Sequence, residues 1–294
     1  TTTVPMLQVP AVGIDLGTST SSIAVLSEDG TPQLLADPHG DTIVPSVVRL
    51  SPDGALVVGA PARAGAVAHS ERIAMETKRI MGTGETVRLG KKVLFPEEIS
   101  AEILRHLKNT AETRLGRPVR DVVLSVPARF ENAAREATRK AAEMAGLKAL
   151  RLINEPTAAA LAYGLDRLSD RSKILVFDFG GGTLDVTILE MFEGILDVRT
   201  SVGDDRLGGK DVDEIVMGVL RDAFKARHGR RLPPPSKDRR IAQILKEEAE
   251  RIKVALSSEE AVPVRVDDLD EGAGIETCFT REQLDSHLED HLMR

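Results

Sequence analysis

Residues 177–185 read Phe-Asp-Phe-Gly-Gly-Gly-Thr-Leu-Asp, and the fold that we expect depends on this stretch. An apolar run, residues 174–177, leads into it and another, residues 186–189, leads out, which predicts two strands joined by a tight glycine turn. Glycine has no Cβ, so the amides of the turn can close on a bulky anion and adopt positive φ at little cost. Successive N–H groups in such a turn form an anion-binding nest.

Two carboxylates, Asp178 and Asp185, flank this turn. Carboxylates beside a bound phosphate would repel it unless a hard cation such as Mg²⁺ lies between them. The stretch therefore predicts a phosphate-binding turn beside a magnesium site. Taken alone, it is equally compatible with an ordinary glycine-rich hairpin turn, because short motifs also occur without the function.

An earlier stretch, residues 14–22, repeats the layout as Ile-Asp-Leu-Gly-Thr-Ser-Thr-Ser-Ser. Asp15 and Gly17 take the places of Asp178 and Gly180, and apolar runs again flank the turn. Two such hairpins facing each other would hold a polyphosphate from both sides. Because they are far apart in the chain, we expect each to belong to its own lobe of a duplicated architecture.

Composition limits the class of protein. The 294 residues are enough for two lobes, and 41% hydrophobic with 29% charged residues is typical of a soluble globular chain. The net charge of −7 argues against nucleic acid as the main partner. No apolar run reaches the roughly 20 residues of a membrane helix, and the polar start does not resemble a signal peptide. A single cysteine, Cys278, excludes internal disulfides and favours a reducing compartment, so we expect cytoplasmic localisation.

Hydrophobic periodicity and turn residues predict an alternation of strands and helices. In the first half we expect a three-strand meander over 11–35, hairpins over 43–58 and 85–95, a short helix over Ala60–Ala68, a segment 71–81 that carries Lys78, a helix from Pro96 to Gly116, a strand over 121–126, a helix over 132–145, a strand over 150–153 and a helix from Pro156 to Gly164. In the second half we expect a meander over 173–201, helices over 211–228 and 236–257, strands over 261–266 and 274–279, and a final helix opened by a capping box at 280–283.

Glu155 stands between a predicted strand and a predicted helix. That junction places its carboxylate at the carboxyl end of a strand, where open α/β sheets bind ligands. An acid at a helix start, favoured by the helix dipole, explains the residue equally well on local grounds.

Four motifs resemble, as a set, the nucleotide-binding domain of the DnaK-type heat-shock chaperones, within the actin and sugar-kinase superfamily. They are residues 14–20, 154–164, 177–185 and 207–211. The resemblance extends from about Val12 to the C-terminus, and the short stretch 82–95 is similar to the compact HscC-type chaperones. It implies an α/β, actin-like two-lobed ATPase fold built on ribonuclease H-like repeats, with a subdomain inserted in each lobe.

The resemblance also implies domain bounds. Lobe I covers 1–165, with its core at 11–36 and 113–165 and an inserted subdomain at 37–112. Lobe II covers 166–294, with the start of its core at 166–203 and an inserted subdomain at 204–294. The family continues after the last predicted helix with a strand and a glycine-containing adenosine loop, so we expect the second lobe to be incomplete here.

Site residues follow from the resemblance at matching positions. The family holds Mg²⁺ largely through water, oriented by carboxylates that match Asp15 and Asp178, with Asp185 as a further candidate and Glu155 nearby. Lys78 matches the lysine that positions the attacking water or the γ-phosphate, although its local sequence alone would suggest a solvated lysine. The phosphate loops match Gly17, Thr18, Ser19 and Thr20 on one side and Gly180, Gly181, Gly182 and Thr183 on the other.

Further family roles fall on helix residues. Glu250, Lys253 and Ser257 match the helix that contacts adenosine, and their spacing puts them on one face, which is also usual for a solvated charged face. Pro127 and Arg135 match a pair that relays nucleotide state.

The implied function is ATP binding and hydrolysis, coupled to client-peptide binding by a domain outside this chain. ATP or ADP with Mg²⁺ are the implied cofactors, with K⁺ as a further candidate. A J-domain co-chaperone and a nucleotide-exchange factor are the implied partners, and we expect no nucleic acid or membrane partner. Two alternatives stay open at this point: a small-molecule kinase of the same superfamily and an actin-like filament-forming ATPase.

Overall fold

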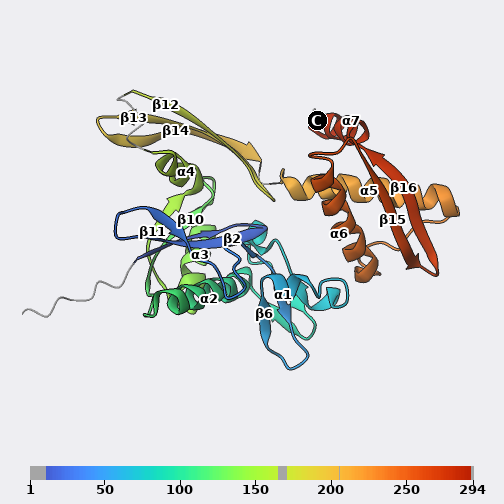
Figure 1. The fold of residues 1–294 in the computed structure, drawn as a ribbon, viewed down its shortest axis with the longest axis horizontal. Coiled ribbons are helices and arrows are strands. Elements are labelled where there is room, and N and C mark those ends of the chain that lie inside the picture. Colours follow the sequence, from blue (N-terminus) through green and yellow to red (C-terminus); the bar gives the residue numbers. More distant parts are fainter. Residues whose placement is uncertain (1–10, 165–170, 205, 293–294) are drawn as a thin grey trace, which may run out of the picture. The chain divides into compact units, whose positions relative to one another are not determined.

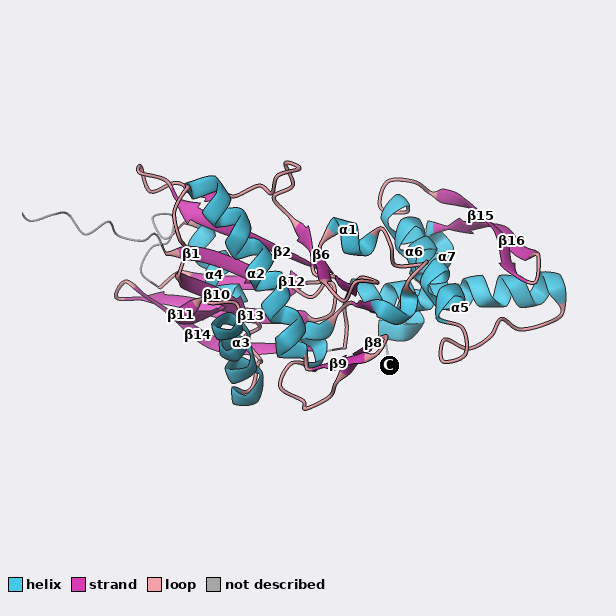
Figure 2. Cartoon of the chain, turned by 90° about the horizontal axis from the view of Figure 1, so that it is seen from below, coloured by secondary structure: helices cyan, strands magenta, loops and turns pink. Residues whose placement is uncertain are grey.

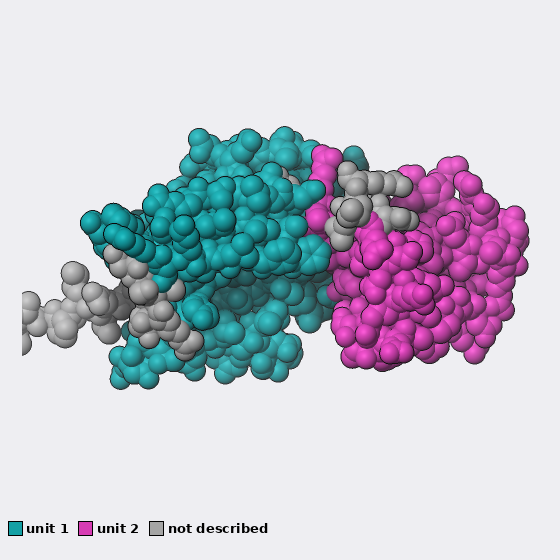
Figure 3. All heavy atoms as spheres, turned by 90° about the horizontal axis from the view of Figure 1, so that it is seen from above, with its two compact units in different colours: residues 1–64, 72–205 teal, residues 65–71, 206–294 magenta. Residues whose placement is uncertain are grey.

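The chain forms two compact units, residues 1–64 with 72–205 and residues 65–71 with 206–294 (Figure 3). The computed structural model describes residues 11–164, 171–204 and 206–292. Each unit has its own hydrophobic core. The predicted lobe boundary at 165/166 touches residues outside the described ranges, so the division into two lobes stays a prediction.

A mixed sheet forms the centre of the first unit (Figure 1). Its strand order is β11-β10-β1-β2-β3, and β4 also pairs with β2. The strands are β1 (Val12–Leu16), β2 (Thr20–Leu26), β3 (Pro32–Leu34), β4 (Val44–Pro45), β10 (Asp121–Val126) and β11 (Lys148–Asn154). β1, β10 and β11 run parallel, whereas β1, β2 and β3 form the expected antiparallel meander. The parallel strands therefore end at the same edge of the sheet.

Three helices cover this sheet (Figures 1 and 2). They are α2 (Pro96–Leu115), α3 (Asn132–Met144) and α4 (Glu155–Tyr163). α2 packs beside α3, and α4 contacts β10 and β11 as well as the second sheet. The predicted end of α2 is confirmed: Gly116 has φ 64°, a left-handed conformation that glycine adopts without a steric penalty.

The second sheet of this unit contains the glycine turn. It is an antiparallel meander of β12 (Lys173–Phe179), β13 (Leu184–Phe192) and β14 (Ile195–Asp204), which confirms the meander expected over 173–201. β12 and β13 pair so that Asp178 lies opposite Asp185, with residues 180–183 forming the turn between them.

Short elements complete the first unit. They are β5 (Val48–Leu50), β6 (Leu56–Val58), β7 (Ile73–Ala74), β8 (Val87–Leu89), β9 (Lys92–Leu94), α1 (Ala60–Arg63) and a 3₁₀ helix, Thr77–Ile80. An earlier 3₁₀ helix, Ser70–Arg72, contains residues of both units. The helix expected over Ala60–Ala68 was wrong beyond Arg63, because Gly65 disfavours its continuation. Lys78 lies in the second 3₁₀ turn, entered through Glu76 in a left-handed conformation with φ 59°.

The second unit packs helices against a β-hairpin (Figure 1). It contains α5 (Gly209–His228), α6 (Arg239–Ala255), β15 (Ala261–Asp270), β16 (Ala273–Thr280) and α7 (Arg281–Leu292). α6 begins after Asp238, whose carboxylate accepts a hydrogen bond from the Ile241 amide over 2.9 Å, and not at Ser236 as expected. The capping box at 280–283 is confirmed by reciprocal bonds between Thr280 and Gln283.

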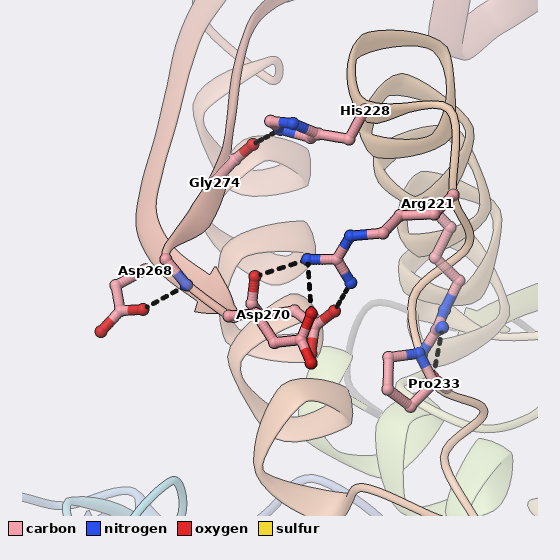
Figure 4. Close-up of polar contacts among 9 residues, drawn as sticks. Arg221, His228, Pro233, Asp268, Asp270 and Gly274 are labelled. Atoms are coloured by element: carbon pink, nitrogen blue, oxygen red, sulfur yellow. Dashed lines mark hydrogen bonds and ion pairs between the residues drawn. The ribbon is translucent and has the colours of Figure 1, made fainter.

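Polar contacts fix the end of α5 to the hairpin (Figure 4). Arg230 pairs with the Asp270 carboxylate and donates to the Asp270 carbonyl, while its guanidinium lies 5.4 Å from the centre of the Phe224 ring. His228 bonds the Gly274 carbonyl over 2.8 Å. Within the described residues, no helix has the length and apolar character needed to cross a membrane.

The core of the first unit can be tested at Leu104 of α2, whose side chain is 0% exposed. We expect Leu104→Ala to lower the free energy of unfolding by about 2–5 kcal/mol, because it removes buried methyl groups and leaves a cavity. Urea unfolding followed by circular dichroism measures the change. Leu26→Ala is the matched control, since Leu26 is 69% exposed and should change stability by less than about 1 kcal/mol. Equal losses in both variants would contradict the assignment of Leu104 to the core.

Candidate functional site

Three polar side chains meet at the carboxyl edge of the first sheet. Asp15 lies near the end of β1, Ser125 near the end of β10, and Glu155 directly after β11. The Ser125 hydroxyl donates to Asp15 Oδ1 over 2.5 Å, a contact that follows from the parallel pairing of β1 with β10. The predicted position of Glu155 at a strand end is confirmed, because β11 ends at Asn154. Open α/β sheets bind ligands at this edge.

The structure brings the two glycine hairpins together. A Cβ on Gly181 would lie 2.1 Å from Ser19 Oγ, and a Cβ on Gly182 would lie 2.9 Å from Thr18 Cγ2. Both distances are shorter than ordinary Cβ contacts, so a side chain at either position would have to displace the Ser19 hydroxyl or the Thr18 methyl group. None of Gly180, Gly181 and Gly182 has φ in the left-handed region, so this turn does not use the freedom of glycine to adopt positive φ. Close approach between the hairpins is the reason for these glycines.

In both turns the first glycine lies beside the carbonyl of the threonine three residues later. The Gly180 amide donates to the Thr183 carbonyl over 3.0 Å. In the first hairpin, a Cβ on Gly17 would lie 2.2 Å from the Thr20 carbonyl oxygen. This shared proximity agrees with the interpretation of the two stretches as copies of one motif.

A cavity of about 440 Å³ lies where the hairpins and the sheet edge meet. It collects most of the residues predicted from the sequence for phosphate, metal and catalysis. Its lining comprises Asp15, Gly17, Thr18, Ser19, Thr20, Lys78, Ser125, Glu155, Asp178, Gly180, Gly181 and Thr183, together with Ala158, Ala159 and Ala162 of α4. Gly182 and Asp185 do not line it. Gly182 is buried beside Thr18, and Asp185 is 2% exposed.

An ion pair joins two parts of the cavity wall. Lys78 Nζ donates to Glu155 Oε1 over 2.6 Å, and the two side chains are only 10% and 18% exposed. The same ammonium lies 6.0 Å from the centre of the Phe130 ring. Lys78 is therefore held in the cavity and is not the solvated lysine that its local sequence would suggest.

Burial of the acids shapes the electrostatics. Burial raises the pKa of Glu155 above its ordinary value, the Lys78 ammonium opposes this rise, and the charges of Asp15 and Asp178 add to it. Burial likewise raises the pKa of Asp178, with Lys78 opposing and Asp15 adding. The cavity thus concentrates carboxylates whose mutual repulsion a bound cation would relieve.

The carboxylates fit a cation held partly by water. Among the described residues, no cluster of three or more His, Cys, Asp or Glu side chains could hold a metal ion by itself. Asp15 and Asp178 line the same cavity, and the charge of Asp15 contributes to the raised pKa of Asp178. Oxygen ligands of this kind, completed by water, suit Mg²⁺.

A second cavity of about 380 Å³ shares Thr18, Lys78 and Thr183 with the first. Its wall includes Pro127, one of the two positions matched to the relay pair. The other, Arg135, donates to the Phe130 carbonyl over 2.8 Å and to Asn154 Oδ1 over 2.9 Å. Arg135 therefore connects the loop after β10 to the residue that precedes Glu155. A relay of nucleotide state through Pro127 and Arg135 stays a prediction.

The predicted adenosine residues Glu250, Lys253 and Ser257 belong to α6 and its end, in the second unit. Lys253 is engaged there: its ammonium lies 2.6 Å from the buried carboxylate of Asp213 and donates to the Gly209 carbonyl over 2.9 Å. It thus holds the start of α5. A role of these residues in nucleotide binding stays a prediction.

Comparisons with known proteins agree with this architecture. The family model described as Hsp70 protein matches residues 11–88 and 83–294. The chain is a member of the Hsp70 family. It is 45% identical over 247 residues to proteins named Chaperone protein DnaK from Thermotoga petrophila and Thermotoga maritima, and 44% identical to the one from Thermotoga neapolitana. Each alignment covers 84% of this chain and 41% of the relative, so the chain spans less than half the length of these Hsp70 relatives.

Sequence reasoning missed several residues of this Hsp70 site. Ser125 gave a usable signal, because it ends a parallel strand just as Asp15 and Glu155 do. The alanines of α4 that face the cavity gave none, since small residues on a helix have many explanations. Ser46, which bonds the first hairpin, lies 29 residues from its partner Gly17, and no local pattern marks it.

The contact between the hairpins can be tested at Gly181. We expect Gly181→Ala to destabilise the Hsp70 chain by about 1–3 kcal/mol, because the added methyl overlaps the Ser19 hydroxyl and lies 3.1 Å from the Ser19 Cβ, so that this side chain must rotate and its surroundings must shift. Gly180→Ala is the matched control, since a Cβ there meets only the Thr183 carbonyl at 3.6 Å, an ordinary contact. Thermal unfolding by calorimetry compares the two variants. Equal destabilisation would contradict the close approach at Gly181.

The electrostatic coupling can be tested at Lys78. We expect Lys78→Met to raise the pKa of both Glu155 and Asp178, because the ammonium opposes the rise in each. A ¹³C NMR titration of the carboxyl groups measures this shift. In the native chain, both acids have a higher pKa than in the unfolded chain. The free energy of unfolding therefore falls as pH rises from the ordinary pKa, 4.5 for Glu155, through the raised pKa of the folded state. Unchanged titration of Glu155 in Lys78→Met would contradict the ion pair.

Proposed function

We propose that this chain is the ATP-binding and ATP-hydrolysing module of a DnaK-type molecular chaperone. The observation that carries the proposal is the pair of hairpins that meet at one cavity, with the Lys78–Glu155 pair in its wall. Membership of the Hsp70 family supports it. No observation favours a small-molecule kinase or an actin-like filament protein.

In this proposal the hairpins hold the polyphosphate. The loops Gly17–Thr20 and Gly180–Thr183 bind phosphate oxygens from both sides through their amides and hydroxyls. Phosphoryl transfer depends mainly on positioning and charge stabilisation, so a held lysine and oriented carboxylates suffice at the reacting end. Lys78 positions the attacking water or the γ-phosphate. Glu155, Asp178 and Thr183 lie around this reacting group.

Mg²⁺, when bound, would neutralise charge that develops on the phosphates. Asp15 and Asp178 would orient it largely through water. Asp185, buried opposite Asp178 in the strand pairing, would support that carboxylate from behind. K⁺ is a further candidate cofactor.

The rest of the chain completes the proposed domain. Glu250, Lys253 and Ser257 would contact adenosine. The proposal includes a two-lobed actin-like arrangement, with lobes over 1–165 and 166–294 and inserted subdomains at 37–112 and 204–294. It also includes the compact HscC-type layout. We also propose that residues 1–294 alone turn over ATP weakly. In the family, a later glycine loop forms the wall of the adenosine pocket that faces the helix matched by Glu250, Lys253 and Ser257.

The proposed partners follow from the family. They are a J-domain co-chaperone and a nucleotide-exchange factor, with client peptides bound by another domain of the same protein. The proposed location is the cytoplasm.

ATP hydrolysis can be tested at Lys78. We expect Lys78→Ala to leave binding of Mg²⁺-ATP largely intact and to lower turnover by about 10²-fold or more, because it removes positioning and charge stabilisation. Single-turnover measurements with radiolabelled ATP report the chemical step directly. Addition of a chelator should abolish turnover if Mg²⁺ participates.

A matched control separates this role from a general loss of charge. Lys140→Ala removes an exposed lysine of α3, paired on the surface with Glu97, and should leave turnover unchanged. Turnover in Lys78→Ala equal to that of the Lys140→Ala control would remove Lys78 from the mechanism. Absence of any ATP binding by the unaltered chain would overturn the proposed function itself.

A further inference from the structure

Ser46 bonds the first hairpin at two points from outside the cavity. It follows β4, is 5% exposed, and is not among the residues that line the cavity. Its hydroxyl donates to the Gly17 carbonyl over 2.8 Å, and its backbone N–H donates to the Ser19 carbonyl over 2.9 Å. A residue of the segment predicted as an inserted subdomain is thus fixed to the phosphate loop.

The Ser46 hydroxyl has a second contact, and the bond to Gly17 settles the direction of this one. Ser46 Oγ lies 2.8 Å from Ser21 Oγ, and Ser21 is 1% exposed. A serine hydroxyl has one proton to donate and two lone pairs that accept. Since the Ser46 proton goes to the Gly17 carbonyl, Ser21 must be the donor to Ser46. Ser21 can therefore be removed without removing the bond to Gly17.

The bond to Gly17 fixes the direction of an amide. In a planar trans peptide, the C=O of one residue and the N–H of the next point in opposite directions. Ser46 holds the Gly17 carbonyl, so the Thr18 N–H of the same peptide points away from Ser46. The Ser19 carbonyl is held in the same way, so the Thr20 N–H also points away from Ser46. Within the described residues, no backbone carbonyl accepts a hydrogen bond from the amide of Thr18 or Ser19.

We infer that Ser46 is a positioning residue for the phosphate loop: by holding the Gly17 carbonyl on the outer side, and the Ser19 carbonyl with it, it directs the amide of Thr18 toward the cavity. An anion in the cavity then meets donors that are already oriented, which lowers the cost of ordering the loop on binding. The inference rests on the proposed function, because it assigns the cavity to the phosphates of a nucleotide. Ser46 touches no ligand itself and acts through the hairpin.

The test compares ligands with and without phosphates. We expect Ser46→Ala to weaken binding of Mg²⁺-ADP about tenfold, the loss of one positioning hydrogen bond, and to leave adenosine binding unchanged. Ser21→Ala, the matched control, removes a neighbouring buried hydroxyl but keeps the bond to Gly17 and should change neither affinity. Ser46→Thr keeps the hydroxyl and should restore affinity for ADP. Calorimetric titration of the 294-residue chain and its variants measures all of these.

A measurement without ligand gives an independent readout. In ¹⁵N NMR spectra, the Thr18 amide should exchange faster with solvent and shift in Ser46→Ala but not in Ser21→Ala. If Ser46→Ala fails to fold, Ser46→Cys replaces the hydroxyl with a weaker donor of similar size and should produce a smaller loss of the same kind.

The outcomes separate the two proposals. Equal weakening of ADP and adenosine, an equal effect of Ser21→Ala, or an unchanged affinity for ADP in the Ser46 variants would overturn the positioning role. Failure of the unaltered chain to bind Mg²⁺-ADP would instead overturn the proposed function, and the Thr18 amide would still report on Ser46.

Discussion

The close approach of Gly181 to Ser19 is the constraint on which the site depends. The two hairpins approach this closely where neither Gly181 nor Gly182 carries a Cβ. A Cβ at Gly181 would displace the Ser19 hydroxyl, and a Cβ at Gly182 would displace the Thr18 methyl group. These glycines therefore suit a contact between two distant parts of the chain, and the dihedral angles of their own turn do not require them.

The site gathers charge at a cost to folding. Asp15, Asp178, Glu155 and Lys78 line one cavity, and burial raises the pKa of Glu155 and Asp178 while the Lys78 ammonium opposes both rises. A carboxyl whose pKa is raised in the folded state holds its proton while the unfolded chain releases it, so stability falls as pH rises through that window. Such a cluster is typical of functional sites, where a ligand or cation offsets the repulsion.

Much of the fold could be predicted because its signals are local. The paired hairpins, the strand before Glu155, the ends of α2 and the capping box at Thr280 all follow from residues a few positions apart. The partners of the site residues could not, because they come from strand register and chain packing. Ser125 reaches Asp15 across parallel strands, Glu155 meets Lys78 from 77 residues away, and both contacts appear only when the sheet edge is assembled. The helix expected over Ala60–Ala68 shows the opposite failure. Gly65 is a local helix breaker, and the prediction did not take it into account.

The pairing of Lys78 with Glu155 is compatible with a role for the same lysine toward a ligand. An ammonium has three donors, and one bond to Glu155 leaves two for other acceptors. Without Glu155, the long side chain could adopt many rotamers and would lose that freedom on binding a phosphate. The ion pair therefore orients Lys78 in advance. Because Arg135 fixes Asn154, the residue before Glu155, the position of the lysine also depends on the loop after β10. Lys78 is thus connected to that loop through Glu155, Asn154 and Arg135, with the step from Asn154 to Glu155 made by the backbone.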